Sequence, residues 1–193
     1  MANNHIFDFG KVGIEESRKA LKKAGVDWFG DPLDKDKKSF IYHTDPLNLV
    51  GKSVAFVGFN QFLGVDSIEN TVEEIKKRKF DGDIVVVFSH WGDEYVSAND
   101  FQKNTARGFI DAGADLVVGA HPHVIQESDV YKGKMIYYSL GNFIFDQWWN
   151  SDVKKGMGIE LTIPSEKDKK ITTDTVFFES SRSGAVCPIS DLR

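Results

Sequence analysis

The chain is poor in the features that would place it in several special classes of protein. It has a single cysteine, Cys187, among 193 residues, so it can form no internal disulfide and has no second thiolate for a zinc cluster. No segment approaches the roughly 18 consecutive apolar residues that span a bilayer, and the first residues lack a signal-peptide pattern. We therefore expect no membrane segment in this chain, which as written would stay where it is made.

Positive charge is not in excess either. The chain has 24 lysine and arginine residues against 29 aspartate and glutamate residues, which gives a formal net charge of −5. Because an acidic surface repels nucleic acid phosphates and anionic lipids, we expect no nucleic acid partner. The remaining composition, with 41% hydrophobic and 27% charged residues, is typical of one globular domain with a sizeable core.

Hydrophobic patterns predict helices alternating with strands up to Val124, and only strands after it. Helices are expected over 12–24, after a capping box formed by Asp66 and Glu69, and over 100–112. Strands are expected over 26–30, 53–59, 83–88 and 116–120, and then over 135–139, 156–163 and 171–178. The last two strands are joined by the charged turn 165–169, so the final third of the chain is expected to form an antiparallel sheet.

Histidines follow two of the predicted buried strands. His90 comes after the apolar run 83–88, and His121-Pro122-His123 comes after the run 116–120. The C-terminal tips of buried strands are where α/β folds usually place their chemistry. Residues two positions apart in an extended segment point the same way, so both imidazoles could reach one metal ion or two adjacent ions. Taken alone, the segment could equally be an ordinary polar turn, and His90 at the neighbouring tip makes that alternative weaker.

Three further groups of residues are candidates for a functional role. Asn4 offers an amide oxygen as a hard metal ligand, and His5 could steady a phosphoryl oxygen without binding metal. His43 is interpreted as a loop histidine without a function. Trp148 and Trp149 are interpreted as packing or surface aromatics, with a polymer-binding patch as the alternative.

Four sequence blocks together resemble a known family. They read Asn-Asn-His-Ile-Phe-Asp-Phe-Gly over 3–10, His-Trp-Gly-Asp-Glu-Tyr over 90–95, Gly-Ala-His-Pro-His over 119–123 and Tyr-Ser-Leu-Gly-Asn-Phe-Ile-Phe-Asp over 138–146. Their order and spacing are similar to the successive signatures of the CapA family of bacterial poly-gamma-glutamate capsule biosynthesis proteins. That family belongs to the calcineurin-like metallophosphoesterase superfamily, and the resemblance covers nearly the whole chain.

The resemblance implies a four-layer α/β/β/α metallophosphoesterase-like sandwich that lacks its first strands and has a C-terminal antiparallel β portion. It treats residues 1–193 as the C-terminal part of one such domain, with a motif-bearing α/β portion over 1–146 and a β-rich portion over 147–193. The chain opens inside a motif, so we expect it to be truncated at its N-terminus.

The resemblance also implies a site with two divalent metal ions, without distinguishing Mn, Fe or Zn. Asn4, His90 and His121 resemble ligands of the second ion, and His123 resembles a ligand of the first. His5 resembles the histidine that contacts the substrate phosphoryl group and protonates the leaving group. Three carboxylates within the signatures are expected to orient histidines and not to bind metal directly: Asp8, Glu94 and Asp146.

Two functions follow as expectations. The first is a metal-dependent hydrolase of phosphoesters, with the metal pair lowering the pKa of a bound water; the second is a non-catalytic scaffold in a complex that synthesises or exports a polymer. Polyglutamate or its synthesis complex is the expected partner, and the family suggests an extracytoplasmic, membrane-anchored parent protein. Two aspartate motifs of the superfamily are missing, so the isolated chain is expected to be inactive, or even unstable because of an exposed sheet edge.

Overall fold

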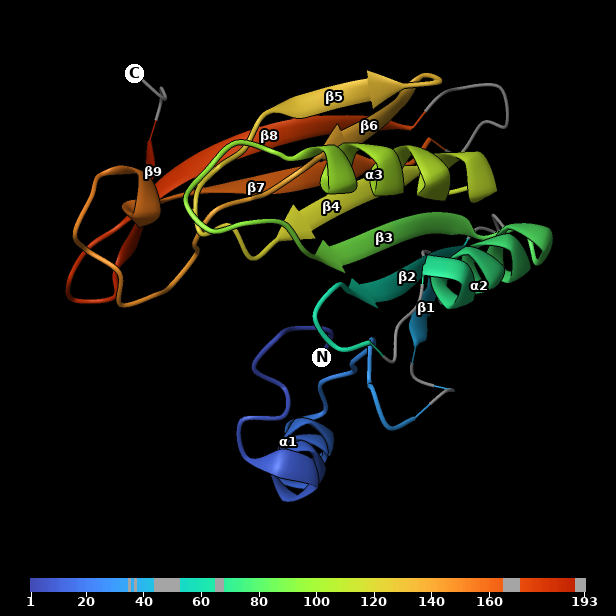
Figure 1. The fold of residues 1–193 in the computed structure, drawn as a ribbon, viewed down its shortest axis with the longest axis horizontal. Helices are drawn as coiled ribbons and strands as arrows, with labels where there is room; N and C mark the ends of the chain where they lie inside the picture. The colour runs from blue at the N-terminus through green and yellow to red at the C-terminus, as the bar shows by residue number, and fades with distance from the viewer. Residues whose placement is uncertain (35, 37, 44–52, 65–67, 165–170, 190–193) are drawn as a thin grey trace.

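The described part of the chain folds as two β-sheets with three α-helices (Figure 1). The computed structural model describes residues 1–34, 36, 38–43, 53–64, 68–164 and 171–189. The helices in this part of the chain are α1 (Gly10–Ala24), α2 (Ile68–Phe80) and α3 (Asp100–Ala112), and the 3-10 turn η2 (Asp152–Lys154) precedes β7. No described helix is both long and apolar enough to cross a bilayer.

The larger sheet has six strands in the order β1-β2-β3-β4-β6-β5. Its strands are β1 (Ser39–His43), β2 (Ser53–Asn60), β3 (Ile84–His90), β4 (Leu116–Ala120), β5 (Ser128–Tyr131) and β6 (Lys134–Tyr137). The four central strands run parallel, and the edge strands β1 and β5 are antiparallel to their neighbours. The parallel strands therefore end at one common edge, and the predicted histidines follow two of them.

The smaller sheet is antiparallel, as the sequence predicts. It has the order β7-β8-β9, with strands β7 (Lys155–Thr162), β8 (Thr172–Ser180) and β9 (Val186–Ile189). Figure 1 shows it behind the larger sheet, on the face opposite to α2 and α3. The mixed α/β fold with a separate antiparallel sheet is thus confirmed, and the described residues form three of the four layers that the resemblance implies.

The core lies on both faces of the larger sheet, and β3 shows why. Val85 and Val87 point into a cluster with Phe109 of α3 and Ile75 of α2. Val86 points to the opposite face, into a cluster with Met157 and Phe177 of the smaller sheet. Because successive strand residues alternate in direction, a strand covered on both sides must be apolar at every position. The continuous run 83–88 is therefore confirmed as a buried strand.

The N-terminal region differs from the prediction at one segment. Residues 26–30 do not form a strand, although their apolar pattern favours one. The N-terminal amino group of Met1 donates a hydrogen bond to the Phe29 carbonyl, and a Cβ built on Gly30 would lie 2.6 Å from that of Ala2. The segment therefore packs tightly against the first residues of the chain, with Gly30 at a φ of +67°, where a strand residue would not be.

Other predictions from the sequence have mixed outcomes. His43 is not in a loop, because it ends β1 and its backbone pairs with that of Ser53. The cap expected from Asp66 and the charged turn 165–169 lie outside the described residues. Helix α2 itself is confirmed, with Ile75 fully buried on its inner face.

Candidate metal centre

The histidines at the strand tips come together because β3 and β4 are adjacent and in parallel register. His90 is paired with Ala120 in that register, so His121 follows immediately beside it. The rings of His90 and His121 lie with their centroids 4.9 Å apart, and those of His121 and His123 are 5.9 Å apart. The three histidines therefore form one cluster at the C-terminal edge of the larger sheet.

The turn that carries His121 and His123 has an unusual backbone. His121 has a φ of 102° and His123 a φ of 61°, in the left-handed region that side chains with a Cβ rarely adopt. The turn is held from outside, since the Tyr95 amide donates to the Pro122 carbonyl at 2.9 Å. Backbone conformations of this kind cost free energy and concentrate at functional sites, which supports a functional reading of the turn.

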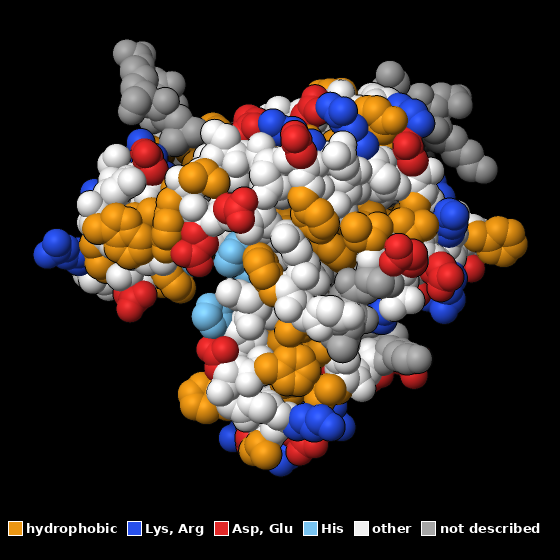
Figure 2. Space-filling view, in the orientation of Figure 1, with side chains coloured by type: hydrophobic (Ala, Val, Ile, Leu, Met, Phe, Trp, Pro, Cys, Tyr) orange, Lys and Arg blue, Asp and Glu red, His pale blue; other side chains and the backbone are white. Residues whose placement is uncertain are grey.

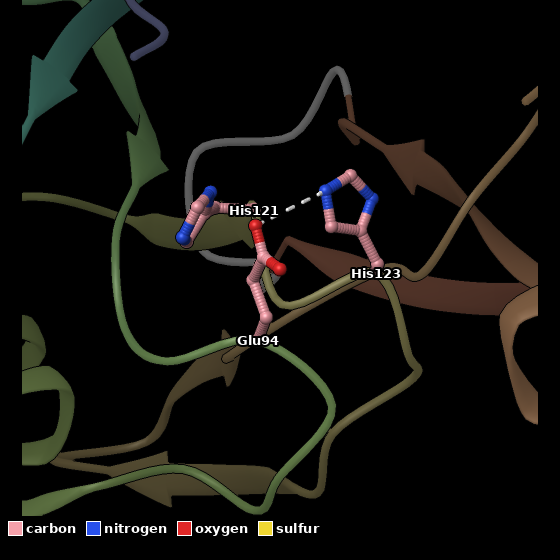
Figure 3. A group of neighbouring side chains, drawn as sticks. All are labelled: Glu94, His121 and His123. Atoms are coloured by element: carbon pink, nitrogen blue, oxygen red, sulfur yellow. Dashed lines mark ion pairs between the residues drawn. The ribbon is translucent and has the colours of Figure 1, made fainter. Parts of the chain in front are cut away.

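Glu94 completes the group (Figure 3). Its carboxylate points between His121 and His123, and one ligand atom from each of the three residues lies within 4.8 Å of the others. The Glu94 Oε1 atom is 3.9 Å from Nε2 of His123. The sequence predicts Glu94 as a carboxylate that only orients a histidine. In the structure it stands with two predicted ligands and can itself reach an ion that they hold.

Asn4 reaches the cluster from the other end of the chain. Its Oδ1 atom lies 2.9 Å from Nε2 of His90, 86 positions away in sequence. Because an amide oxygen can only accept, Nε2 of His90 donates a hydrogen bond to it. The contact brings an imidazole and an amide together at the cluster, and both are donor types that suit a divalent ion such as Mn, Fe or Zn.

His5 is next to Asn4 but lies more openly. Its Nδ1 atom is 2.9 Å from Oδ2 of Asp8, and both side chains are more than half exposed. Asp8 thus contacts His5, and its expected role of orienting a histidine stays a prediction. His5 is also one of the charges that lower the pKa of His90, so it belongs to the same neighbourhood.

Burial and crowding keep the central imidazoles neutral. Burial is the largest cause that lowers the pKa of His90 to about 3, and neighbouring histidines add to it. The pKa of His121 is also lowered, mainly by burial, although the nearby Glu94 carboxylate opposes the shift. A neutral imidazole keeps a free lone pair, and a metal ligand needs one.

The segment between β6 and β7 forms a wall beside His123. Oδ1 of Asn142 accepts a hydrogen bond from Nδ1 of His123 at 2.8 Å, and Phe145 stacks on the ring with centroids 5.0 Å apart. Asp146 is exposed on the same segment, and the structure gives its predicted role no support. Trp149 is 62% exposed and meets the ring of Tyr95 edge to face, which leaves both interpretations of this tryptophan open.

Several residues of this site were not singled out from the sequence. They are Asn60 and Gln61 at the tip of β2, Phe62, whose ring lies 4.4 Å from that of His121, and Asn142. Gln61 accepts a hydrogen bond from the Gly92 amide, and Asn60 is fully buried with an unpartnered Nδ2 atom. The sequence position of Asn60 and Gln61 could have indicated them, because they follow a predicted strand just as His90 does.

The surface around the cluster is hollowed and mixed in character. Figure 2 shows histidine side chains at the rim of a notch between the lobe at the α1 end and the rest of the molecule. Hydrophobic and acidic side chains lie next to them in this view. Imidazole, amide and carboxylate groups thus gather at the ends of parallel strands in a mixed α/β fold. The protein therefore belongs to the class of α/β proteins with a polar site at the strand tips.

Comparison with known proteins makes the assignment particular. Residues 1–147 match the family model described as bacterial capsule synthesis protein PGA_cap, and the chain belongs to this family. It is 39% identical over 168 residues to the capsule biosynthesis protein CapA of Bacillus anthracis, which covers 77% of this chain and 40% of the relative. It is also 39% identical over 164 residues to the PGA biosynthesis protein CapA of Bacillus subtilis, covering 77% of this chain and 42% of the relative.

A more distant relative carries a related name. The probable polyglutamine synthesis accessory protein of Mycobacterium tuberculosis is 28% identical over 168 residues, covering 76% of this chain and 44% of the relative. The chain thus spans well under half the length of these curated relatives. The sequence-based recognition of the CapA family is confirmed.

Proposed function

We propose that this chain carries most of the metal site of a metal-dependent phosphoester hydrolase that acts in the biosynthesis of a capsule or poly-gamma-glutamate polymer. The process is suggested by the names of the two Bacillus relatives. The proposed hydrolase activity rests on one observation. Asn4, His90 and His121 come together at one edge of the sheet, with His123 and Glu94 beside them.

Each residue has a defined part in this proposal. Asn4, His90 and His121 hold one ion, while His123 and Glu94 are placed to contribute to a second position. A divalent ion bound here would supply Lewis acidity toward a phosphoryl oxygen and toward a bound water. His5, exposed and paired with Asp8, is free to meet the leaving group and to give it a proton from the ring.

The chain is proposed to act as part of a longer protein. Residues 1–146 bear the motifs, the strands β7, β8 and β9 of the smaller sheet lie within 147–193, and we propose that the two portions belong to one domain. An envelope location and an association with the polymer or its synthesis complex are proposed from the names of the relatives, and the intact protein is proposed to hold two ions.

The alternative is a non-catalytic part in polymer synthesis. The word "accessory" in the name of the mycobacterial relative favours it. In that case the fold would serve as a scaffold, and the histidine cluster would bind an ion without turnover.

One experiment separates the two. Bound metal is measured by elemental analysis, and phosphomonoesterase and phosphodiesterase activity is measured with Mn²⁺, in this chain and in a version extended at its N-terminus. Each is compared with its His121→Ala variant, and His43→Ala is the matched control because β1 carries it to the opposite edge of the sheet from the cluster. Activity in the extended protein that His121→Ala abolishes and His43→Ala keeps supports the hydrolase. Bound metal without activity supports the scaffold, and absence of both refutes the metal site.

A further inference from the structure

Asn142 occupies a backbone position that is fixed by the smaller sheet. Its backbone N–H donates a hydrogen bond to the Lys155 carbonyl at 3.3 Å, and the preceding Gly141 forms an antiparallel β-bridge with Gly156. A Cβ built on Gly156 would lie 2.2 Å from the Asn142 carbonyl oxygen, so only glycine allows this close approach. The Asn142 side chain is 7% exposed and thus has little freedom to move.

The orientation of the side-chain amide of Asn142 follows from its hydrogen-bond partners. Its Nδ2 atom donates to the Val153 carbonyl at 2.9 Å and to Oε1 of Gln147 at 3.2 Å. A backbone carbonyl can only accept a hydrogen bond, so the atom facing Val153 must be the nitrogen. The Oδ1 atom is then the one that faces His123, at 2.8 Å from its Nδ1.

This arrangement dictates where His123 carries its proton. An amide oxygen can only accept, so Nδ1 of His123 must donate to it. In a neutral imidazole the other nitrogen, Nε2, then holds the free lone pair. Unconstrained histidine prefers the opposite tautomer, with the proton on Nε2, so Asn142 selects the less common form.

The rest of the surroundings fixes the ring in the same orientation. Tyr95 and Phe145 stack on His123, at centroid distances of 5.9 and 5.0 Å and interplanar angles of 26° and 27°. Nε2 faces the Glu94 carboxylate at 3.9 Å. A ring flip would place a carbon atom against the Asn142 oxygen and would lose the hydrogen bond.

We propose that Asn142 is a positioning residue that holds His123 in the tautomer protonated on Nδ1, so that Nε2 is the atom available to an ion. The tautomer stands on the hydrogen bonds alone, whereas its use for metal binding rests on the proposed function. A second residue that fixes a ligand histidine in this way typically contributes 10-fold to 100-fold in metal affinity.

The first test uses the metal-free 193-residue chain with ¹⁵N-labelled histidine. Long-range proton–nitrogen correlation spectra report which ring nitrogen bears hydrogen, and the spectrum of a His123→Gln variant identifies the signals of His123. At a pH where the spectrum shows a neutral ring, we expect hydrogen on Nδ1 of His123. Hydrogen on Nε2 in the unaltered chain overturns the proposal, and this measurement needs no variant of Asn142.

Two variants then test the role of Asn142. Asn142→Leu removes the acceptor, so hydrogen is expected to move to Nε2, whereas Asn142→Asp keeps an acceptor and should keep hydrogen on Nδ1. If Asn142→Leu does not fold, Asn142→Ala replaces it. An unchanged tautomer after removal of the acceptor refutes the role of Asn142.

Zn²⁺ titration of the same proteins separates this proposal from the proposed function. We expect Asn142→Leu to bind Zn²⁺ 10-fold to 100-fold more weakly than the unaltered chain, and Asn142→Asp to bind it at least as tightly as Asn142→Leu. Equal affinity of Asn142→Leu and the unaltered chain refutes the positioning role but leaves the metal site intact. No Zn²⁺ binding by the unaltered chain refutes the metal site, while the tautomer result stands separately.

Discussion

The side chains of Asn4 and His90 are joined by a hydrogen bond of 2.9 Å, although 86 positions separate the two residues in the chain. The contact joins the first residues to the tip of β3. It brings an amide and an imidazole together at the cluster of histidines. The first motif of the chain therefore meets the motif that follows β3.

We expect His90→Ala to remove one ligand of this pair and to weaken the binding of Mn²⁺ or Zn²⁺ by at least 10-fold, with a smaller loss in Asn4→Ala. In thermal unfolding, an ion at 100 times its Kd should stabilise the unaltered chain by about 2.7 kcal/mol. His43→Ala is the control. A metal-induced stabilisation that survives in His90→Ala would show that the ion binds elsewhere.

Gly119 should be the most sensitive glycine of the site. A Cβ there would lie 1.8 Å from the Tyr138 carbonyl oxygen and 2.4 Å from Nε1 of Trp91, which donates to that same oxygen. Gly119→Ala should therefore lower the free energy of unfolding by about 3 kcal/mol or more, as overpacking does.

The matched control for this prediction is Gly108→Ala in α3. A Cβ at Gly108 meets nothing within 4 Å, and alanine favours a helix over glycine by about 1 kcal/mol. It should stabilise the chain slightly. Urea denaturation measures both changes, and similar effects of the two substitutions would contradict the packing described at Gly119.

Acid should destabilise the fold through Asp115. Burial alone would raise the pKa of this carboxyl, but hydrogen bonds from Lys134, Lys79 and the Val85 amide outweigh it and lower the pKa below its usual 3.8. A group with a lowered pKa in the folded state adds stability above its unfolded value and loses it as the pH falls through the folded value.

The expected result is a loss of stability below about pH 4 that is smaller in Asp115→Asn, measured by urea denaturation between pH 2 and pH 7. Asp111→Asn is the control, because Asp111 pairs with Lys132 at the exposed surface, where ion pairs contribute about 0 to 1 kcal/mol. Acid sensitivity that is identical in the unaltered chain and Asp115→Asn would contradict this account.

Helix α1 should depend on one ion pair. Arg18 donates two hydrogen bonds to Asp31, at 2.7 and 2.6 Å, and the Asp31 side chain is fully buried. Removal of one partner leaves a buried charge unpaired, which typically costs 3 to 5 kcal/mol, less here because Arg18 is partly exposed.

Arg18→Ala should therefore release α1 from the segment around Asp31 before the rest unfolds. Hydrogen exchange should show faster exchange at the amides of α1 and little change in α3. Lys19→Ala is the control, since Lys19 pairs with Glu16 at the exposed surface of the same helix. Full protection of α1 in Arg18→Ala would mean that Ile14, its one buried residue, is enough to hold it.

The central strands and α3 could be predicted from the sequence because their signals are local. The run around Val86 is apolar at each position, and α3 has Asn99 as its cap and Gly113 after its end. The edge strands β1, β5 and β9 could not be predicted so easily. They are short and half exposed; Val130 of β5, for example, is 60% exposed, so no clean alternation marks them.

The candidate site divides in the same way. His90 and His121 were predictable because each follows a buried strand. The place of Glu94 depends on the path of a loop, which is set by Gly92 at a φ of +82° and by the bond from the Tyr95 amide to Pro122. The part played by Asn142 depends on the carbonyl groups of Val153 in η2 and Lys155 in β7, and no pattern near Asn142 predicts them.

The close packing of Gly141 against Gly156 has a consequence for engineering and for the exchange of segments between relatives. The family model ends at residue 147, yet Asn142 is held by the carbonyls of Val153 and Lys155, beyond that boundary. A chimera that transplants only the matched region would carry the histidines without the support behind His123. Recombination should keep the contacts that hold Asn142 only where the crossover falls after Gly156.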